Sequence, residues 1–269
     1  MVPTPRRCLR LPMRGDGVTA RLSAVVIARD EAEAIGACLD SVAFADEIVV
    51  VDSGSVDATV AIAAARGARV IHQAWLGFGP QKRFAVAAAA HDWVLCIDAD
   101  ERVSPELRAS IERALAAPAS RAYRFARRNR FLGRWLRHGE GYPDWSLRLF
   151  DRRAARWSED TVHEKVVADG PVGTLAGDLL HESAETLASY LEKNNRYTSL
   201  QAQALLAAGR RTNAAKLVLS PLARFIKFYV ARLGFLDGAA GFAHIAIGCF
   251  NSFLKNAKLM ELQRRGDRS

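Results

Sequence analysis

Four short apolar segments alternate with helix-forming segments in the first hundred residues, and this alternation constrains the fold more than any other feature. The apolar segments are residues 22–28, 47–51, 69–72 and 93–98. Each is short, rich in β-branched residues and bounded by polar ones, as buried strands are. Strands that alternate with helices through short connections form parallel sheets covered on both faces. The sequence therefore predicts an α/β fold.

Helix signals fill the intervals between these segments. Residues 58–66 follow Asp57, which suits an N-cap, and residues 81–90 follow Pro80, which suits a first helical turn. Ser104 and Pro105 begin another expected helix, which ends near residue 116. Beyond it we expect an extended segment over 122–131, strands over 146–150 and 162–167, and helical periodicity over 184–208 and within 214–260.

These patterns predict three parts of the chain. Residues 1–20 carry Pro, Arg and Gly without a long apolar stretch, so we expect a flexible tail. Residues 21–183 form the expected α/β domain, and residues 184–269 a helical C-terminal extension. Residues 238–254 of this extension carry no formal charge but are too few for a confident membrane span. An amphipathic helix pair lying in a membrane interface and a helical lid packed on the sheet both fit this segment.

Carboxylates follow two of the expected strands. Asp52 comes after the second strand, and Asp98 and Asp100 come after the fourth. Open α/β sheets bind ligands at the carboxyl ends of their strands, so these side chains are expected at one edge. Two neighbouring carboxylates repel each other unless a cation lies between them, and a hard divalent cation that carries phosphate oxygens meets that need. A solvated turn is the plain alternative.

The charge of the chain points to an anionic partner. The formal net charge is +9 and the pI is near 9.8, and seven arginines and no acid lie between Arg121 and Arg137. A nucleic acid, a lipid surface or a phosphorylated small molecule would each suit this balance. Aromatic residues between the arginines could stack on bases, but no nucleic-acid-binding motif is present, so no nucleic-acid partner is expected. The four cysteines form no Cys-x-x-Cys pair.

Five strings in order resemble the family 2 glycosyltransferases, which have the GT-A fold and use nucleotide sugars. They are ARDEAEAIGACLDSV, IVVVDSGSVDAT, WVLCIDADE, YPDWSLRLF and VHEKV, and the resemblance covers roughly residues 22–197. The strings are most similar to the branch of lipopolysaccharide core β-1,4-glucosyltransferases. This implies a GT-A fold, Rossmann-like with a mostly parallel sheet flanked by helices, followed by the helical C-terminal extension, for which the interfacial pair and the lid both stay open.

The resemblance also implies roles in binding the donor. Ala28, Arg29 and Glu31 would line the pocket for the base and ribose, and Asp52 would accept a hydrogen bond from uracil. Asp98 would lie near the ribose. Lys82, Arg83 and Arg148 are the candidates for contacts to phosphate, and Asp100 is the candidate ligand of Mg²⁺ or Mn²⁺.

Transfer of a sugar needs a base that deprotonates the acceptor hydroxyl. Glu164 is the preferred candidate because of its distance after the metal motif, and Asp144 is the second. His163 could orient the site or contact the metal.

The function implied is that of an inverting transferase, which moves a hexose, preferably glucose, from a UDP-sugar. The acceptor would be a lipopolysaccharide core or another lipid-linked glycan, and the enzyme would be cytoplasmic at the inner face of the plasma membrane. Two alternatives remain open at this point. One is a phosphatase with an Asp-x-Asp nucleophile, and the other is a basic module that binds RNA or anionic lipid without catalysis.

Overall fold

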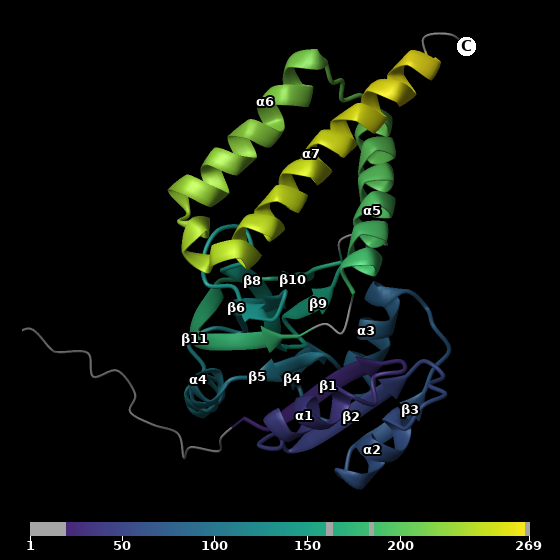
Figure 1. The fold of residues 1–269 in the computed structure, drawn as a ribbon. Helices are drawn as coiled ribbons and strands as arrows, with labels where there is room; N and C mark the ends of the chain where they lie inside the picture. The colour runs from purple at the N-terminus through teal and green to yellow at the C-terminus, as the bar shows by residue number, and fades with distance from the viewer. Residues whose placement is uncertain (1–19, 160–163, 183–185, 267–269) are drawn as a thin grey trace, which may run out of the picture.

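The structure is a computed structural model that describes residues 20–159, 164–182 and 186–266. A sheet of nine strands forms its centre, and long C-terminal helices stand beyond one half of the sheet (Figure 1). The α/β prediction is confirmed by this arrangement.

The first four strands form the parallel half of the sheet. They are β1 (Leu22–Ala28), β2 (Glu47–Asp52), β3 (Arg69–His72) and β4 (Trp93–Asp98), in the order β3-β2-β1-β4. Ala28 pairs with Asp52 and Ile27 with Asp98, so the carboxyl ends of these strands are level. The predicted edge, with acids after the second and fourth strands, is therefore present.

The later strands extend the sheet in mixed directions. They are β8 (Asp144–Asp151), β6 (Ala122–Phe131), β11 (Val172–His181) and β5 (Glu101–Val103), in that order after β4. β8 is antiparallel to both β4 and β6, whereas β11 is parallel to β6. A short strand β7 (Arg134–Trp135) pairs with β6, and β9 (Ala155–Trp157) with β10 (Val166–Ala168) forms a separate ribbon. The strand expected over 162–167 begins later, at Val166, and residues 160–163 lie outside the described part of the chain.

Two apolar cores cover the two faces of the sheet. Along β1, Leu22, Ala24 and Val26 belong to one core, and Val25 and Ile27 to the other, as the period of two in a strand requires. Helices α1 (Ile35–Ser41) and α4 (Pro105–Ala116) pack into the first core, and α3 (Phe78–Ala88) into the second. A further helix, α2 (Thr59–Ala65), packs beside β3. The helix expected from Gln81 begins earlier, at Phe78.

The contact between α4 and β11 depends on a glycine. Gly177 has a φ of +92°, and a Cβ there would lie 2.2 Å from the backbone nitrogen of Leu107. We expect Gly177→Ala to lower the free energy of unfolding by at least about 2 kcal/mol, because both the backbone and the helix must shift. Gly170→Ala is the matched control, since nothing lies within 4 Å of its Cβ position. Equal urea midpoints for the two variants would contradict this account.

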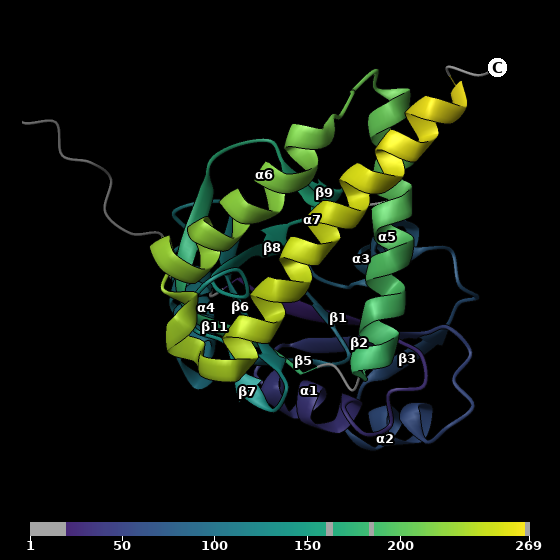
Figure 2. The same cartoon turned by 45° about the horizontal axis from the view of Figure 1, so that its top comes forward.

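The C-terminal helices form a layer over the second half of the sheet. They are α5 (Leu187–Ala207), α6 (Ala214–Phe225) and α7 (Gly238–Gly266), and α7 packs against both others (Figure 2). A π-helical turn (Ile226–Ala231) and a 3-10 turn (Gly234–Asp237) join α6 to α7. Buried Asp237 accepts hydrogen bonds from the backbone nitrogens of Arg137 and His138, at 2.9 and 2.8 Å. This carboxylate connects the helical layer to the loop after β7. The predicted boundary between the α/β domain and the helical extension at residue 183 stays a prediction.

The outer side of this layer is apolar. Helix α6 has no buried residue, and Val218, Leu219 and Leu222 are each more than half exposed. Among the described residues no single helix is long and apolar enough to cross a bilayer. The segments 214–231 and 234–265 reach that length and composition only together, with a bend of 74° between them.

Candidate active site

A cleft of about 840 Å³ opens at the carboxyl edge of the parallel strands. It gathers most of the predicted site residues, which come from β1, α3, β4, β8 and the segments that follow them. These are Ala28, Arg29, Glu31, Lys82, Asp98, Asp100, Asp144, Arg148 and Glu164. The sheet therefore brings together residues that lie more than a hundred positions apart in the sequence.

Asp98 lies between two cations. Lys82 Nζ is 3.2 Å from Asp98 Oδ1, and Arg148 donates to Oδ2 at 3.2 Å. Burial by itself would raise the pKa of Asp98, but Arg148 and Lys82 outweigh it and hold the pKa well below its usual range. Asp98 is therefore a permanent carboxylate, and it fixes both cations on the wall of the cleft.

Glu101 is a buried acid that contacts the backbone of Asp98 and the side chain of Arg148. The sequence assigned no role to Glu101, yet its side chain is fully buried and accepts a hydrogen bond from the backbone nitrogen of Asp98 at 2.9 Å. Its other oxygen lies 3.4 Å from Arg127 and 3.6 Å from Arg148. A buried acid beneath two arginines balances their charge and holds their position.

The two candidate bases each face a cation. Glu164 Oε1 lies 3.4 Å from Lys82 Nζ, which itself lies over the ring of Trp157. Asp144 accepts from Arg127 at 2.8 Å on the opposite strand of the sheet. Both carboxylates line the cleft, so the geometry leaves both in reach of a bound substrate.

Asp100 faces a histidine that the sequence did not single out. Asp100 Oδ2 lies 3.1 Å from Nε2 of His181, the last residue of β11, and His181 Nδ1 lies 2.8 Å from Asn129 Oδ1. The amide nitrogen of Asn129 donates to the Gly141 carbonyl at 3.3 Å, so its oxygen is turned toward the ring and Nδ1 carries the proton. Nε2 therefore faces the carboxylate of Asp100.

This pair fits a divalent cation. A carboxylate and an imidazole whose other nitrogen is held by a hydrogen bond are a common pair of metal ligands. Within the described ranges no group of three His, Cys, Asp or Glu side chains gathers as a metal site would. Asp100 and His181 could therefore hold a metal only if the ligand supplies further oxygens, as a diphosphate does. His163, the histidine predicted for this role, lies outside the described residues.

Two predicted residues lie off the wall of the cleft. The carboxylate of Asp52 accepts from the backbone nitrogens of Gly54 and Ser55, at 2.9 and 3.0 Å, and it is Ser53 that lines the cleft. Burial would raise the pKa of Asp52, but a hydrogen bond from the Ser55 hydroxyl, together with these backbone hydrogen bonds, lowers it. Arg83 donates to the Ser158 carbonyl at 2.6 Å, and so ties α3 to the loop after β9.

Several residues of the wall were missed because they come from the helical layer. Lys193, Asn194, Tyr197 and Gln201 all project from one side of α5 into the cleft. Others come from loops, from the first residue of α3 and from later strands, namely Ser53, Trp75, Phe78, Arg127, Ser146 and His181. The helical extension, for which an interfacial helix pair and a lid both stayed open, thus forms one wall of the site.

Glu31 follows β1 and lies among several acidic residues of the cleft. Its burial, followed by the charges of Asp100, Asp57 and Asp98, raises its pKa from 4.5 to about 7. Because the folded-state pKa exceeds the unfolded one, stability is lost as the pH rises from 4.5 through 7.

We expect Glu31→Gln to raise the melting temperature at pH 8 by about 2 °C or more and to leave it unchanged at pH 4. Melting curves at both pH values, with exposed Glu192→Gln as the control, test this. An equal change in melting temperature at pH 4 and pH 8 would contradict the raised pKa of Glu31.

The comparison with known proteins settles the class. A model of the family described as glycosyl transferase family 2 matches residues 23–166, which include β1 to β4 and the whole Asp98–Asp100 motif. The chain belongs to glycosyl transferase family 2. Together with the observed sheet, this membership confirms the expected GT-A fold class, and it favours a nucleotide-sugar-dependent glycosyltransferase over the phosphatase and the binding module.

Relatives of this family 2 glycosyltransferase extend over nearly its whole length. It is 32% identical to the lipopolysaccharide core biosynthesis glycosyltransferase LpsC of Rhizobium meliloti, over 89% of this chain and 92% of that protein. It is 33% identical to an uncharacterized glycosyltransferase of Rickettsia bellii, over 91% and 88%. Glucosyl-3-phosphoglycerate synthase from Mycobacterium tuberculosis, solved with Mn²⁺ and UDP-glucose, is 18% identical with a TM-score of 0.47, over 72% and 81%.

Proposed function

We propose that this family 2 glycosyltransferase moves a hexose, preferably glucose, from a UDP-sugar to a lipopolysaccharide core or another lipid-linked glycan, with inversion at the transferred carbon. The observation that carries the proposal is the cleft edge where Asp98 holds Lys82 and Arg148, beside the pair Asp100 and His181. Cations next to a carboxylate–imidazole pair suit a metal-bound diphosphate leaving group. The acceptor class follows from the similarity to the lipopolysaccharide core enzyme of Rhizobium meliloti.

The donor would lie along the parallel edge. Ala28, Arg29 and Glu31 are placed to contact the base and ribose, because they follow β1 and line the cleft. The backbone nitrogens of the turn after Asp52 already donate hydrogen bonds to its carboxylate. Asp52 would therefore accept a hydrogen bond from the uracil N3–H only if this turn opens and frees a carboxylate oxygen. The phosphate contacts are proposed for Lys82 and Arg148, rather than for Arg83, which is engaged with Ser158.

Asp100 and His181 would hold the Mg²⁺ or Mn²⁺. When bound, the ion neutralises charge on the diphosphate and so stabilises the departing UDP. Asn129 fixes the ring of His181, so the protein presents Nε2 without reorganisation.

Transfer also requires a residue that accepts the proton of the acceptor hydroxyl. We propose that Glu164, or Asp144 in its place, accepts the proton of the acceptor hydroxyl as the oxygen bonds to the sugar carbon and the bond to the diphosphate breaks. Lys82 lies between Glu164 and Asp98 and would stabilise both carboxylates until the substrate binds.

A panel of nucleotide sugars with Mn²⁺ or Mg²⁺ tests the donor. We expect UDP-hexoses to raise the melting temperature and to be hydrolysed slowly to UDP. We expect GDP-sugars and CMP-sugars neither to raise the melting temperature nor to be hydrolysed. A preference for a different nucleotide would overturn the UDP assignment, and equal stabilisation in excess EDTA would overturn the metal.

We also propose that the enzyme works in the cytoplasm at the inner face of the plasma membrane, attached through the apolar side of α6 and the turn after it. Val218, Leu219, Leu222, Ile226 and Val230 are all more than half exposed there. Lys216 and Lys227 belong to the same segment, and they suit anionic headgroups.

Flotation with vesicles containing phosphatidylglycerol tests this attachment. Val218→Ser with Leu222→Ser should lower the bound fraction, and Val172→Ser, an exposed change on β11, should not. Binding that is unaffected by the double change, or equal on neutral vesicles, would argue against this face.

A further inference from the structure

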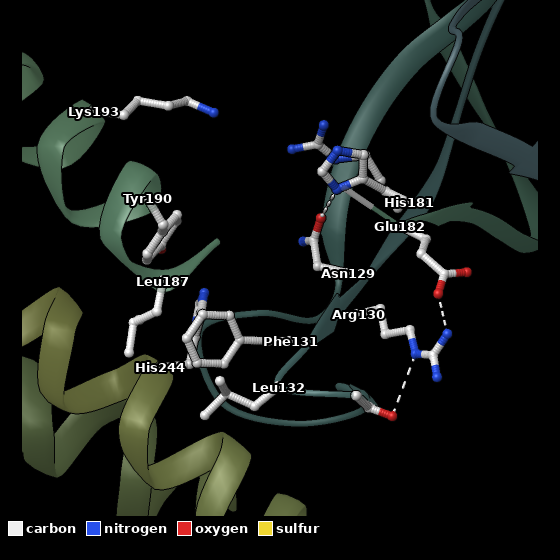
Figure 3. Close-up of a pocket in the computed structure, with 12 residues that line it drawn as sticks. Asn129, Arg130, Phe131, Leu132, His181, Glu182, Leu187, Tyr190, Lys193 and His244 are labelled. Atoms are coloured by element: carbon white, nitrogen blue, oxygen red, sulfur yellow. Dashed lines mark hydrogen bonds and ion pairs between the residues drawn. The ribbon is translucent and has the colours of Figure 1, made fainter. Parts of the chain in front are cut away.

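A second pocket, of about 480 Å³, adjoins the donor cleft. The two spaces share Arg127, His181 and Lys193, so they meet at the residues beside Asp100. The second pocket then extends away from the parallel strands, between the β6–β7 hairpin and helices α5 and α7 (Figure 3). Its volume lies in the range of small-molecule sites, about 300–1,000 Å³.

Aromatic and apolar side chains form one wall of this pocket. The ring of Phe131 points from the hairpin toward Leu187 and His244 (Figure 3). Its centroid lies 5.6 Å from that of Tyr190 on α5 and 5.2 Å from that of His244 on α7. Three separate segments of the chain therefore meet around one ring, and we call this space the aromatic pocket.

The part of the aromatic pocket beyond the shared residues carries one charged side chain of each sign. Among the described residues that line only this pocket, Arg130 and Glu182 are the charged ones, and they form an ion pair; Glu182 also pairs with Arg102, which lies outside the lining of the pocket. Burial and the nearby Arg224 lower the pKa of His244 to about 4, so its imidazole is neutral at pH 7. Asn129 and Tyr190 add neutral polar groups to the same walls.

These walls suit one kind of occupant. An aliphatic chain would displace water from the Arg130–Glu182 ion pair and offer no hydrogen bond in return, which is costly in a recess. A phosphate would have to compete with Glu182 for Arg130 and would lie beside that carboxylate. A sugar ring offers an apolar C–H face for Phe131 and hydroxyl groups for the polar side chains.

We propose that the aromatic pocket is the acceptor subsite and that it takes an uncharged sugar ring of the acceptor, packed against Phe131. The acceptor hydroxyl would then enter the donor cleft past His181, where the two spaces meet. This inference rests on the proposed glycosyl transfer, and it adds the place and the chemical character of the acceptor.

Acceptor kinetics of Phe131→Ala test the proposal. The probes are UDP-glucose and deacylated lipopolysaccharide core oligosaccharides, each used as isolated and after phosphatase treatment. We expect the KM for the oligosaccharide to rise at least about tenfold, because an apolar contact of that size is lost. The slow hydrolysis of UDP-glucose without acceptor and the affinity for UDP should stay unchanged. Phe250→Ala, an exposed ring on α7 that lines neither pocket, is the matched control.

A second variant tests the subsite in case Phe131→Ala does not fold. Leu187 is 45% exposed at the start of α5, so Leu187→Trp should fold normally while it narrows the aromatic pocket. It should also raise the KM for the acceptor and leave donor hydrolysis intact.

An unchanged acceptor KM in both variants would overturn the subsite. A tenfold or larger loss of acceptor use after phosphatase treatment would overturn its uncharged character. A wild-type protein that neither hydrolyses UDP-glucose nor uses any of these acceptors would instead overturn the proposed transfer itself, and the three failures are therefore distinguishable.

Discussion

Asp100→Asn is expected to lower metal-dependent transfer by about 1,000-fold. The substitution keeps the size of the side chain but removes the negative charge that faces His181 Nε2 at 3.1 Å. A cation held by only two protein side chains cannot lose one of them without a large loss of affinity. UDP release from UDP-glucose, measured over a range of Mn²⁺ concentrations, gives the effect.

The control for Asp100 is a carboxylate elsewhere on the surface. Asp169→Asn removes an exposed acid paired with Arg156 and should retain full activity. His181→Ala should raise the Mn²⁺ requirement in the same direction as Asp100→Asn, because both side chains would bind the same ion. Full activity of Asp100→Asn, or of the wild type in excess chelator, would contradict the metal assignment.

Glu164→Gln is expected to lower kcat by about 100- to 10,000-fold with little change in the affinity for UDP. The amide keeps the hydrogen-bonding distance to Lys82 but cannot accept the proton of the acceptor hydroxyl. The measurement is steady-state transfer together with the binding of UDP, so that catalysis and donor binding are separated.

Asp144→Asn decides between the two candidate bases. Its carboxylate is paired with Arg127, so its loss should disturb the cleft but lower kcat less than Glu164→Gln. Glu112→Gln, an exposed acid paired with Arg108 on α4, serves as the control. A larger loss in Asp144→Asn than in Glu164→Gln would move the role of base to Asp144.

The parallel half of the fold could be predicted because its signal is local. Strands buried on both faces appear in the sequence as apolar runs, and their carboxyl ends must lie at one edge of the sheet. This predicts the place of Asp98 and Asp100, which do line the cleft. Lys82 and Arg148 were predicted from the family resemblance, and the structure places both in the same cleft.

The partners of these residues could not be predicted because they depend on long-range strand pairing. His181 reaches Asp100 only because β11 pairs with both β5 and β6, which sets it opposite Glu101 and Asn129. A histidine at the end of a long strand carries no local signal for that position. Glu101 similarly carries no local signal for its place, because it begins the short strand β5 and is buried beneath the cleft.

The helical extension combines the two alternatives that its sequence left open. Helix α5 packs over the site and lines the cleft, as a lid would, while α6 exposes its apolar side, as an interfacial helix does. Periodicity alone reveals that such helices are amphipathic, but it does not reveal which surface each apolar side covers.

The most direct test of the account is the identity of the products. UDP-glucose, Mn²⁺ and a deacylated lipopolysaccharide core oligosaccharide are incubated with the enzyme, and the products are followed by mass spectrometry and nuclear magnetic resonance. The account predicts one β-linked hexose added to the oligosaccharide for each UDP released, and neither product with Asp100→Asn. Release of inorganic phosphate, or UDP formed without any glycosylated oligosaccharide, would contradict it.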